Sequence, residues 1–316
     1  MSDISSVHVD QALTDFAVQL PLPEEFVADI IAPVVPVKKE SDKFYKFYRE
    51  ELKLRNTKRA DGAEANELVM SQTTDTYSCE EYALKAKLTD RVRDNADSVI
   101  RPAQRRVEKV MYALRLDREN RVKTMVEDTS NWGGNTTPST KWDAASADIE
   151  DDIKAAREAF LLNLGVYPNV AVINGEVHAT IIQWLRAQPA GITLAEYRSL
   201  DKFPIRGSVS VNLAGLFGIP KWVVAGAVYD SADFSKVGES NESLARLWAD
   251  NCSLFFINPR PSLESVSAMY TFRSRDWLVK SWRDEAIDST WYQVSYVCDE
   301  KIPSSAAGYI LTDVLT

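Results

Sequence analysis

The chain has 316 residues, of which 45% are hydrophobic and 26% charged, and its formal net charge at pH 7 is −9. This length and composition predict a globular protein with room for two domains of about 150 residues each. The acidic balance argues against a surface dedicated to wrapping nucleic acid, since that affinity comes from clustered Lys and Arg, but it is compatible with enclosing nucleic acid without gripping it.

The distribution of apolar residues and cysteines excludes further classes. The longest apolar runs, such as Ile219 to Val228 and Leu254 to Ile257, fall far short of the about 20 residues that span a bilayer. The N-terminal segment carries acids and no signal-peptide core. Cys79, Cys252 and Cys298 are widely spaced and match neither a disulfide framework nor a zinc pattern. We therefore expect a soluble, non-secreted protein in a reducing compartment, with no membrane partner.

The chain changes character after Val37, where a compact apolar run gives way to a long charged stretch. Aromatic residues stand between charges there, as in Phe44-Tyr45-Lys46-Phe47-Tyr48, and Asp61-Gly62 is a hairpin turn signal. We predict two ribbon strands around this turn. An isolated hairpin is marginal in water, so a ribbon this polar is expected to gain stability by lying on a partner.

The strongest helix signal runs from about Pro102 to Asp128, after a mixed strand predicted at Thr76 to Leu88. Pro102 suits a first helical turn, and apolar residues recur at helical spacing from Val107 to Val126. At about 1.5 Å per residue this helix would span about 40 Å, which is the length of a rod that supports something elongated. Its other faces carry many charges, which we interpret as solvated faces with i,i+4 ion pairs.

A polar loop containing Gly and Pro, at residues 130–140, separates this helix from the second half of the chain, and we place a domain boundary there. The next helix ends at Leu164, and the acids Asp148 and Glu150 to Asp152 near its start are interpreted as capping residues, since no EF-hand spacing surrounds them. The further elements predicted from periodicity are strands at Val170–Ile173 and Trp222–Ala225, helices at Glu176–Gln188 and Leu213–Pro220 (closed by Gly218), and late strands at Ser265–Arg273 and Trp291–Val297. Together they predict an α+β protein, with a central mixed sheet in the second domain and a smaller sheet beside the long helix.

Catalytic and metal-binding patterns are sparse. His8 and His178 alone could act as near-neutral bases, and Glu176 with His178 lacks the i,i+4 spacing of a zinc helix. The glycines match neither a phosphate loop nor a dinucleotide fingerprint, and Cys252 beside an apolar strand is interpreted as core packing. We assign no catalytic, metal or cofactor-binding residue and expect no enzyme. The eight tryptophans are interpreted mainly as core residues, with some as interface anchors.

Several features follow one another in a distinctive order: an apolar segment ending Ile31-Ala-Pro-Val-Val-Pro-Val37, the Lys-Tyr-rich hairpin, Thr76-Tyr-Ser-Cys-Glu-Glu-Tyr82, the long helix, Pro168-Asn169 before a strand, and a closing Ala307-Gly-Tyr-Ile-Leu-Thr-Asp-Val314. This order resembles that of tailed-bacteriophage major capsid proteins, which have the Hong Kong 97-like shell fold. The resemblance covers nearly the whole chain. Each pattern is loose, so its specificity lies in the joint order.

The resemblance implies a division of the chain into parts with different roles. These are an N-terminal arm at 1–33, an extended β-hairpin loop at 34–78, a peripheral domain with a long spine helix at 79–145, an axial domain with a central mixed sheet at 146–259, and strands completing the peripheral and axial domains at 260–316. The arm would reach onto neighbouring subunits, and the extended loop would lie across the adjacent subunit of the same capsomer.

The function implied is that of a major capsid protein that self-assembles into pentamers and hexamers, forming an icosahedral shell around packaged double-stranded DNA. The implied location is the virion, with assembly in the host bacterial cytoplasm. The expected partners are further copies of the chain, a scaffolding protein, a portal and a decoration protein, with DNA enclosed without sequence-specific binding. No long charged leader precedes the arm, which leaves a separate scaffolding protein and a processed form as alternatives.

The resemblance also implies two sets of contact residues. In the extended loop the expected inter-subunit contacts are Phe44, Tyr45, Phe47, Tyr48, Arg49, Arg55 and Arg59. On the spine helix the expected basic face, a local counter-charge for DNA, consists of Arg105, Arg106 and Lys109. No Lys and Asn pair is identified for covalent crosslinking between subunits.

Two alternatives remain open at this point. An encapsulin-like shell uses the same fold to enclose cargo protein, and neighbouring portal and terminase genes would distinguish it from a phage capsid. A soluble α/β enzyme would need a nucleophile, base or metal set that the sequence does not offer.

Overall fold

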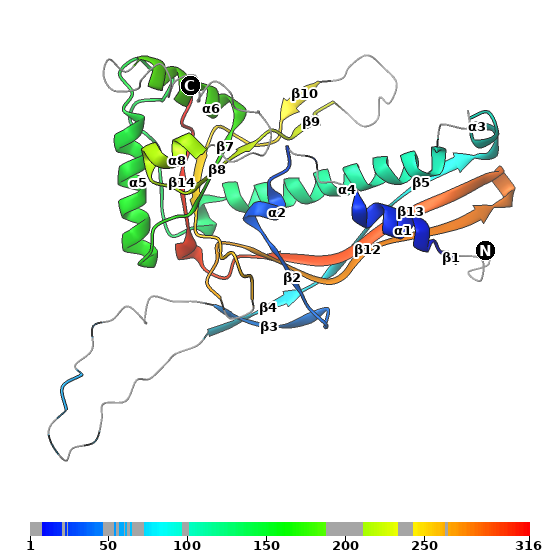
Figure 1. The fold of residues 1–316 in the computed structure, drawn as a ribbon, viewed down its shortest axis with the longest axis horizontal. Helices are drawn as coiled ribbons and strands as arrows, with labels where there is room; N and C mark the ends of the chain where they lie inside the picture. Colours follow the sequence, from blue (N-terminus) through cyan, green and yellow to red (C-terminus); the bar gives the residue numbers. More distant parts are fainter. Residues whose placement is uncertain are drawn as a thin grey trace.

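In the computed structural model, one long helix joins two five-stranded sheets, and two small two-stranded ribbons lie beside them (Figure 1). The structure describes residues 8–20, 23, 25–46, 54, 57–59, 61, 64, 73–96, 101–187, 211–232, 243–262 and 265–316. Helices and mixed, mostly antiparallel sheets make up this part of the chain, which confirms the predicted α+β class. Among the described residues, no helix combines the length and the apolar character needed to cross a bilayer.

The first sheet, here the long-strand sheet, has a hairpin of two long strands at its centre. β12 (Tyr270–Asp284) pairs antiparallel with β13 (Ser289–Lys301), and β13 pairs antiparallel with β5 (Glu80–Thr89). β1 (His8–Val9) adds to β12 antiparallel, and β2 (Val34–Pro36) adds to β12 in parallel. The sheet therefore combines residues from both ends of the chain.

Both central strands are longer than the sequence pattern indicated. Alternation predicted strands at Ser265–Arg273 and Trp291–Val297. The first prediction is wrong for residues 265–269, since β12 begins at Tyr270, and both strands continue beyond the predicted ranges, to Asp284 and Lys301. The register of β12 against β13 shifts between Arg273 and Leu278. Such an irregularity breaks the alternation of inward and outward side chains, so a period of two does not continue through it.

Helix α4 (Pro102–Glu127) covers one face of the long-strand sheet and confirms the predicted long helix. Pro102 occupies the start of the helix, where its missing N–H costs no hydrogen bond. The apolar stripe that begins with Val107 and includes Leu114 packs against Val294 of β13. Burial of this stripe on the sheet stabilises the helix more than its intrinsic propensity does.

The described part of the predicted N-terminal arm lies on its own subunit. Helix α1 (Gln11–Gln19) begins at an Asp10 carboxylate that accepts a hydrogen bond from the Leu13 amide at 3.0 Å. Leu13 and Ala17 are buried in the same cluster as the apolar stripe of α4. The reach of an arm at 1–33 onto neighbouring subunits stays a prediction.

The second sheet, here the short-strand sheet, has the strand order β6, β14, β11, β7, β8. These strands are β6 (Asn135–Thr136), β14 (Gly308–Leu311), β11 (Cys252–Phe255), β7 (Val170–Asn174) and β8 (Lys221–Ala225). β7 and β8 are parallel, and β11 runs antiparallel to both β7 and β14. All residues of β7, β11 and β14 are buried. The apolar runs correctly predicted β7 and β8, whereas no strand ranges were predicted for β11 and β14.

Helices cover both faces of the short-strand sheet. α5 (Ile149–Leu164), α6 (Gly175–Ala187) and α8 (Val211–Phe217) pack on one face, and each confirms a helix predicted from the sequence. Gly218 ends α8 in the left-handed region, with φ 63°, as its position predicted. The other face packs against the C-terminal part of α4 and the short α2 (Ala28–Ile31).

A ribbon of β3 (Ser41–Lys46) and β4 (Thr73–Ser78) lies beside the long-strand sheet (Figure 1). The two strands are antiparallel, which confirms the predicted ribbon, and the strand predicted at Thr76 to Leu88 is divided between β4 and β5. The Phe44 and Tyr77 rings pack on Phe272, with centroids 5.2 and 4.6 Å away. The predicted Asp61-Gly62 turn includes Gly62, which lies outside the described residues.

The remaining elements are short. They are α3 (Asp90–Asp94), η3 (Thr129–Asn131), η5 (Glu285–Ile287), η6 (Ser305–Ala307), β9 (Val228–Asp230) and β10 (Leu244–Arg246). β9 and β10 pair antiparallel as a second small ribbon next to the short-strand sheet (Figure 1). The last part of the chain contributes β12 and β13 to one sheet and β14 to the other. The division into arm, loop, peripheral and axial domains stays a prediction.

Candidate functional site

The residues predicted for inter-subunit contact in the extended loop differ in their surroundings. Tyr45 is 37% exposed on β3, next to the ion pair of Lys46 and Asp75 at 2.7 Å, and Arg59 is exposed. Phe44 is only 2% exposed because its ring packs inside its own subunit, so we leave it out of the contact surface. The others, Phe47, Tyr48, Arg49 and Arg55, lie outside the described residues.

The predicted basic face lies near the N-terminal end of α4. Arg105 and Lys109 are exposed, Arg106 is half-buried, and their spacing of three and four residues places them on one side of the helix. This end of α4 and the β3–β4 ribbon lie in different parts of the molecule (Figure 1). The structure therefore does not bring the two predicted sets together into one site.

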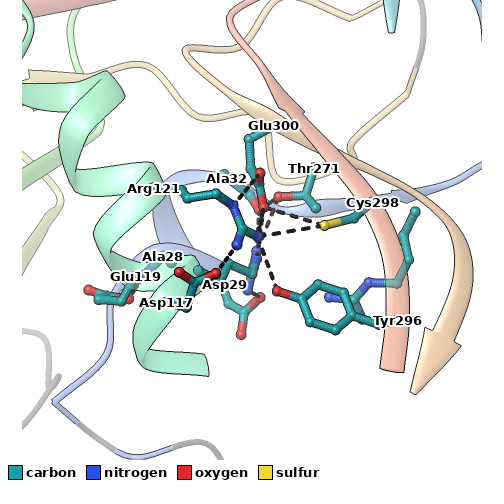
Figure 2. Close-up of polar contacts among 12 residues, drawn as sticks. Ala28, Asp29, Ala32, Asp117, Glu119, Arg121, Thr271, Tyr296, Cys298 and Glu300 are labelled. Carbon is teal, nitrogen blue, oxygen red and sulfur yellow. Dashed lines mark hydrogen bonds and ion pairs between the residues drawn. The ribbon is translucent and has the colours of Figure 1, made fainter. Parts of the chain in front are cut away.

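A buried cluster of charges, here the charge junction, occupies the C-terminal half of α4 instead. Its members are Asp29, Asp117, Arg118, Glu119, Arg121 and Glu300. Figure 2 shows Asp29, Arg121 and Glu300 close together between α4, the N-terminal segment and the last long strands, whereas Glu119 points away from them. The charges of α4 were expected on solvated faces, and this expectation is wrong for Arg118 and Glu119, which are 5% and 0% exposed. It holds for the i,i+4 pair of Arg121 and Asp117.

Arg118 connects three elements. Its guanidinium pairs with Asp29 of α2 and, at 3.6 Å, with Glu300 of β13. The same group donates hydrogen bonds to the Ala32 carbonyl at 3.3 Å and to the Thr271 hydroxyl of β12 at 3.1 Å. Burial alone lowers the pKa of Arg118, but Asp29 and Glu300 outweigh it and raise that pKa. The guanidinium is thus a permanent cation that needs both carboxylates.

Arg121 lies on the next part of the same helix and binds the same acceptor. Its Nε and Nη2 donate to the Glu300 carboxylate at 3.3 and 3.2 Å, and Nη2 also donates to the Tyr296 hydroxyl at 3.0 Å. The guanidinium lies 3.7 Å from the centroid of the Tyr82 ring, within cation–π range. Burial lowers the pKa of Arg121, but Glu300 and Tyr296 together outweigh it and raise that pKa, so the charge is retained.

Glu119 points to the other side of α4 and holds the start of α2. Its two carboxylate oxygens accept hydrogen bonds from the Val27 and Ala28 amides, each at 2.9 Å. Oxygen Oε1 also accepts from the Trp248 indole N–H at 2.9 Å. Burial raises the pKa of Glu119, and the three donors only partly offset that effect. A negative charge at the amide end of α2 is also favoured by the helix dipole.

The interactions of the charge junction indicate a structural role. Its cations are paired with carboxylates and its buried carboxylate is fully hydrogen-bonded, so the cluster joins segments that lie about 270 residues apart in sequence, as Asp29 and Glu300 do. One sequence signal could have located it. Arg118 follows Leu114 by four residues and precedes Val122 by four, so it stands on the apolar stripe of α4.

Cys252, His178 and Asp148 were considered as candidate catalytic or metal-binding residues in the sequence, and the structure shows their environments. Cys252 is fully buried and burial raises the pKa of its thiol to about 12, as expected for core packing. Burial lowers the pKa of His178. Asp148 caps α5 by accepting from the Asp151 amide at 3.1 Å, which confirms its capping role. Within the described ranges, no group of three or more His, Cys, Asp or Glu side chains is placed to hold a metal ion.

Comparison with known proteins identifies the family. The model of a family described as phage capsid protein matches residues 73–299. The chain belongs to this family. The major capsid protein of Burkholderia phage BcepMu is 28% identical over 245 residues, which cover 75% of this chain and 76% of the relative. That of Pseudomonas phage JBD67 is 27% identical over 162 residues, covering 50% and 51%.

Solved structures agree on the fold of this phage capsid protein. A phage-related protein from Bordetella bronchiseptica superposes with a TM-score of 0.70 at 23% identity, covering 97% of both chains. A Mycobacterium phage Ogopogo structure gives 0.58 at 10% identity, covering 92% and 93%. A virus-like particle from Pyrococcus furiosus gives 0.54 at 14% identity, covering 95% and 96%. The predicted Hong Kong 97-like fold and the predicted major capsid protein family are both confirmed.

Proposed function

We propose that this phage major capsid protein assembles into pentamers and hexamers that close into an icosahedral shell around packaged double-stranded DNA. Family membership over residues 73–299 carries this proposal. The β3–β4 ribbon is consistent with it, because Phe44 and Tyr77 fix the ribbon on its own subunit while the Tyr45 side chain stays exposed for a partner surface. Closed symmetry repeats each contact around the shell, so each interface need only be modest.

The ribbon is suited to present the extended loop to an adjacent subunit. Its root is fixed by Phe44 and Tyr77 on Phe272, inside the subunit's own core. Tyr45 and the rest of the extended loop, Phe47, Tyr48, Arg49, Arg55 and Arg59, would then contact the adjacent subunit. A rigid root lowers the entropy lost when such a loop binds, which strengthens the contact.

The proposed contents are DNA, enclosed without sequence-specific binding. The net charge of −9 favours a wall along which DNA moves over one that holds it tightly. A scaffolding protein, a portal and a decoration protein are the further proposed partners, and assembly would take place in the host cytoplasm. The Pyrococcus virus-like particle shares the fold, so fold alone leaves protein cargo as the alternative content, whereas the sequence relatives are phage capsid proteins.

Electron microscopy and sedimentation velocity of the purified protein test this function, alone and co-expressed with candidate scaffold genes from its own locus. We expect uniform shells, or five- and six-fold rings. A protein that stays a monomer or small dimer in both conditions would refute the proposal. Nuclease-protected double-stranded DNA in particles produced during infection would distinguish a genome from protein cargo.

A further inference from the structure

Two groups of exposed apolar side chains lie on the elements around the short-strand sheet. The first, here the α5 patch, consists of Leu162, Val166, Tyr167 and Leu216, which are 81%, 42%, 45% and 44% exposed. The second, here the β9–β10 patch, consists of Val228 and Leu244, which are 44% and 74% exposed and lie on the same face of the β9–β10 pair. Leucines as exposed as Leu162 and Leu244 are costly in water, and clustered ones typically mark contact surfaces.

Side-chain contacts connect the elements that carry the α5 patch. The Tyr167 hydroxyl donates to Glu158 at 3.2 Å, and Glu158 stands one helical turn before Leu162. The Arg157 guanidinium lies 5.1 Å from the centroid of the Tyr167 ring and also borders Gly218, two residues after Leu216. Arg157 therefore links the end of α8 to the loop that follows α5.

The β9–β10 patch is presented by a small ribbon that is fixed at its base. Leu244 pairs with Asp230 in the ladder, and Arg246 pairs with Val228. The Arg246 side chain forms an ion pair with Glu176 at 3.4 Å, just after β7. The Leu247 amide donates to the Ala227 carbonyl at 2.9 Å. These contacts hold the ribbon in a defined position.

The two patches lie at opposite ends of the parallel strands β7 and β8. Val166 and Tyr167 lead into β7, and Leu216 leads into β8. β9 leaves from the far end of β8, and Arg246 contacts Glu176 beyond the far end of β7. Strands of five residues separate the patches by about 17 Å. The two patches thus cannot cover one another within a single chain.

The charges around the patches are complementary. Arg157 and Lys221 lie at the α5 end of the strands, and among the described residues neither forms an ion pair with a carboxylate. Asp230 lies exposed beside Leu244, and its carboxylate accepts only the Ala232 and Ser243 amides within the described part of the chain. These hydrogen bonds lower the pKa of Asp230, so it is an anion at neutral pH. Glu158 offsets one of the two cations at the α5 end, and Arg246 is paired with Glu176 at the other end. Among these side chains, one apolar surface keeps a net positive charge and the other a net negative charge, at opposite ends of the same sheet.

We propose that the α5 patch of one subunit docks on the β9–β10 patch of the next subunit in the same ring. The partner is a second copy of this chain, because two different complementary surfaces at opposite ends of one unit give a head-to-tail contact, which closes into a ring when the rotation permits. A two-fold contact would instead pair one patch with itself. The inference rests on the proposed assembly into pentamers and hexamers and names the surfaces that meet.

Disulfide trapping with engineered cysteines tests this contact. Cys79, Cys252 and Cys298 are buried, so the native thiols give little background. One population carries Leu162→Cys and the other Leu244→Cys, and the two are co-assembled and then oxidised. We expect a crosslinked dimer only from the mixture. A chain carrying both substitutions should give a ladder that stops at pentamers and hexamers on a denaturing gel.

Matched controls separate the possible outcomes. Val92→Cys on α3 is 47% exposed and should not crosslink to Leu162→Cys. Asp230→Lys should lower the yield of the specific crosslink several-fold. Shells without the mixed crosslink, or a homodimer from Leu162→Cys alone, would overturn the head-to-tail contact and leave the proposed function standing. Absence of any assembly by the unmodified chain would overturn the proposed function and the ring contact with it.

Discussion

The two halves of helix α4 both carry several charged side chains but have opposite surroundings. Near its start Arg105 and Lys109 stand in solvent, while in its second half Arg118 and Glu119 are buried. The first half packs one apolar stripe on the long-strand sheet. The second half is enclosed by α2, β13 and Trp248 as well. The difference shows that the partners of a helix, and not the charges on it, decide which of its faces are solvated.

The burial of charge in the second half has a structural consequence. Each buried ion there is stabilised only while its partners from distant segments are in place, because an unpaired charge in the interior is strongly unfavourable. The charge junction therefore makes the docking of the N-terminal segment and of β13 on α4 interdependent. Charges in the first half impose no such coupling, since water solvates them in every state.

The largest difference between the halves is expected on removing a guanidinium. Arg118→Ala leaves Asp29 and the buried Glu300 with too few partners and should lower the free energy of unfolding by about 3–5 kcal/mol. Arg105→Ala, the matched control in the exposed half, should change it by less than about 0.5 kcal/mol. Urea unfolding of the unassembled subunit, followed by tryptophan fluorescence, measures both. Equal effects of the two substitutions would show that the halves do not differ.

A smaller effect, with a distinctive pH dependence, is expected at Glu119. Burial raises its pKa in the folded state above the ordinary value of 4.5, so the folded protein binds a proton more readily than the unfolded chain. Stability from this group is therefore largest below about pH 4.5 and falls as the pH rises through the folded pKa. Glu119→Gln does not titrate. The stability of the unmodified protein relative to this variant should thus decrease with rising pH.

The exposed carboxylate of Asp90 serves as a control, because its contribution to stability should depend on pH with the opposite sign. Hydrogen bonds from Arg283 lower the pKa of Asp90, which lies on α3 near the start of α4. Its contribution is present above its unfolded pKa and is lost as the pH falls through the lower folded value. Between about pH 3 and about pH 8, the stability of the unmodified protein relative to the variant should fall with rising pH for Glu119→Gln and increase with rising pH for Asp90→Asn. Parallel slopes would contradict the assignment at Glu119.

The sequence predicted the secondary structure well where one period dominates. The stripe from Val107 to Val126 located α4, and the short apolar runs located β7 and β8, because burial on one face or on both leaves a regular pattern. β12 was predicted too short, since its register shift breaks the alternation. The family was predicted from the joint order of several sequence patterns, because no single pattern is specific enough to identify it.

The charge junction could not be predicted from the sequence pattern, for a physical reason. A charged residue on a helix reads as solvated unless the segments that cover it are known, and Asp29 and Glu300 come from remote parts of the chain. The position of Arg118 on the apolar stripe was the one local signal, but a single Arg at such a position also suits a side chain that extends to solvent. The predicted contact residues of the extended loop, apart from Phe44, stay predictions.

The smallest effect on stability is expected at the exposed end of α4. Its charged side chains can act only on a molecule outside the subunit, such as DNA. Replacing Arg105, Arg106 and Lys109 together by Gln removes three positive charges that lie on one side of the helix. Each substitution should change the free energy of unfolding by less than about 0.5 kcal/mol, since surface charges contribute little. If this face is a counter-charge for DNA, the variant should form shells that retain less DNA.

Nuclease-protected DNA per particle, measured over a series of salt concentrations, tests whether this basic face acts as a counter-charge for DNA. Loss of phosphate contacts reduces DNA retention most at low salt, because counterion release makes such contacts salt-dependent. An equal change of charge on β5 and α3 is the control, made at Lys85, Lys87 and Arg91. If the α4 variant matches the unmodified shell in both assembly and DNA retention, the exposed half of α4 has no role as a counter-charge, and the two halves differ only in their contribution to folding.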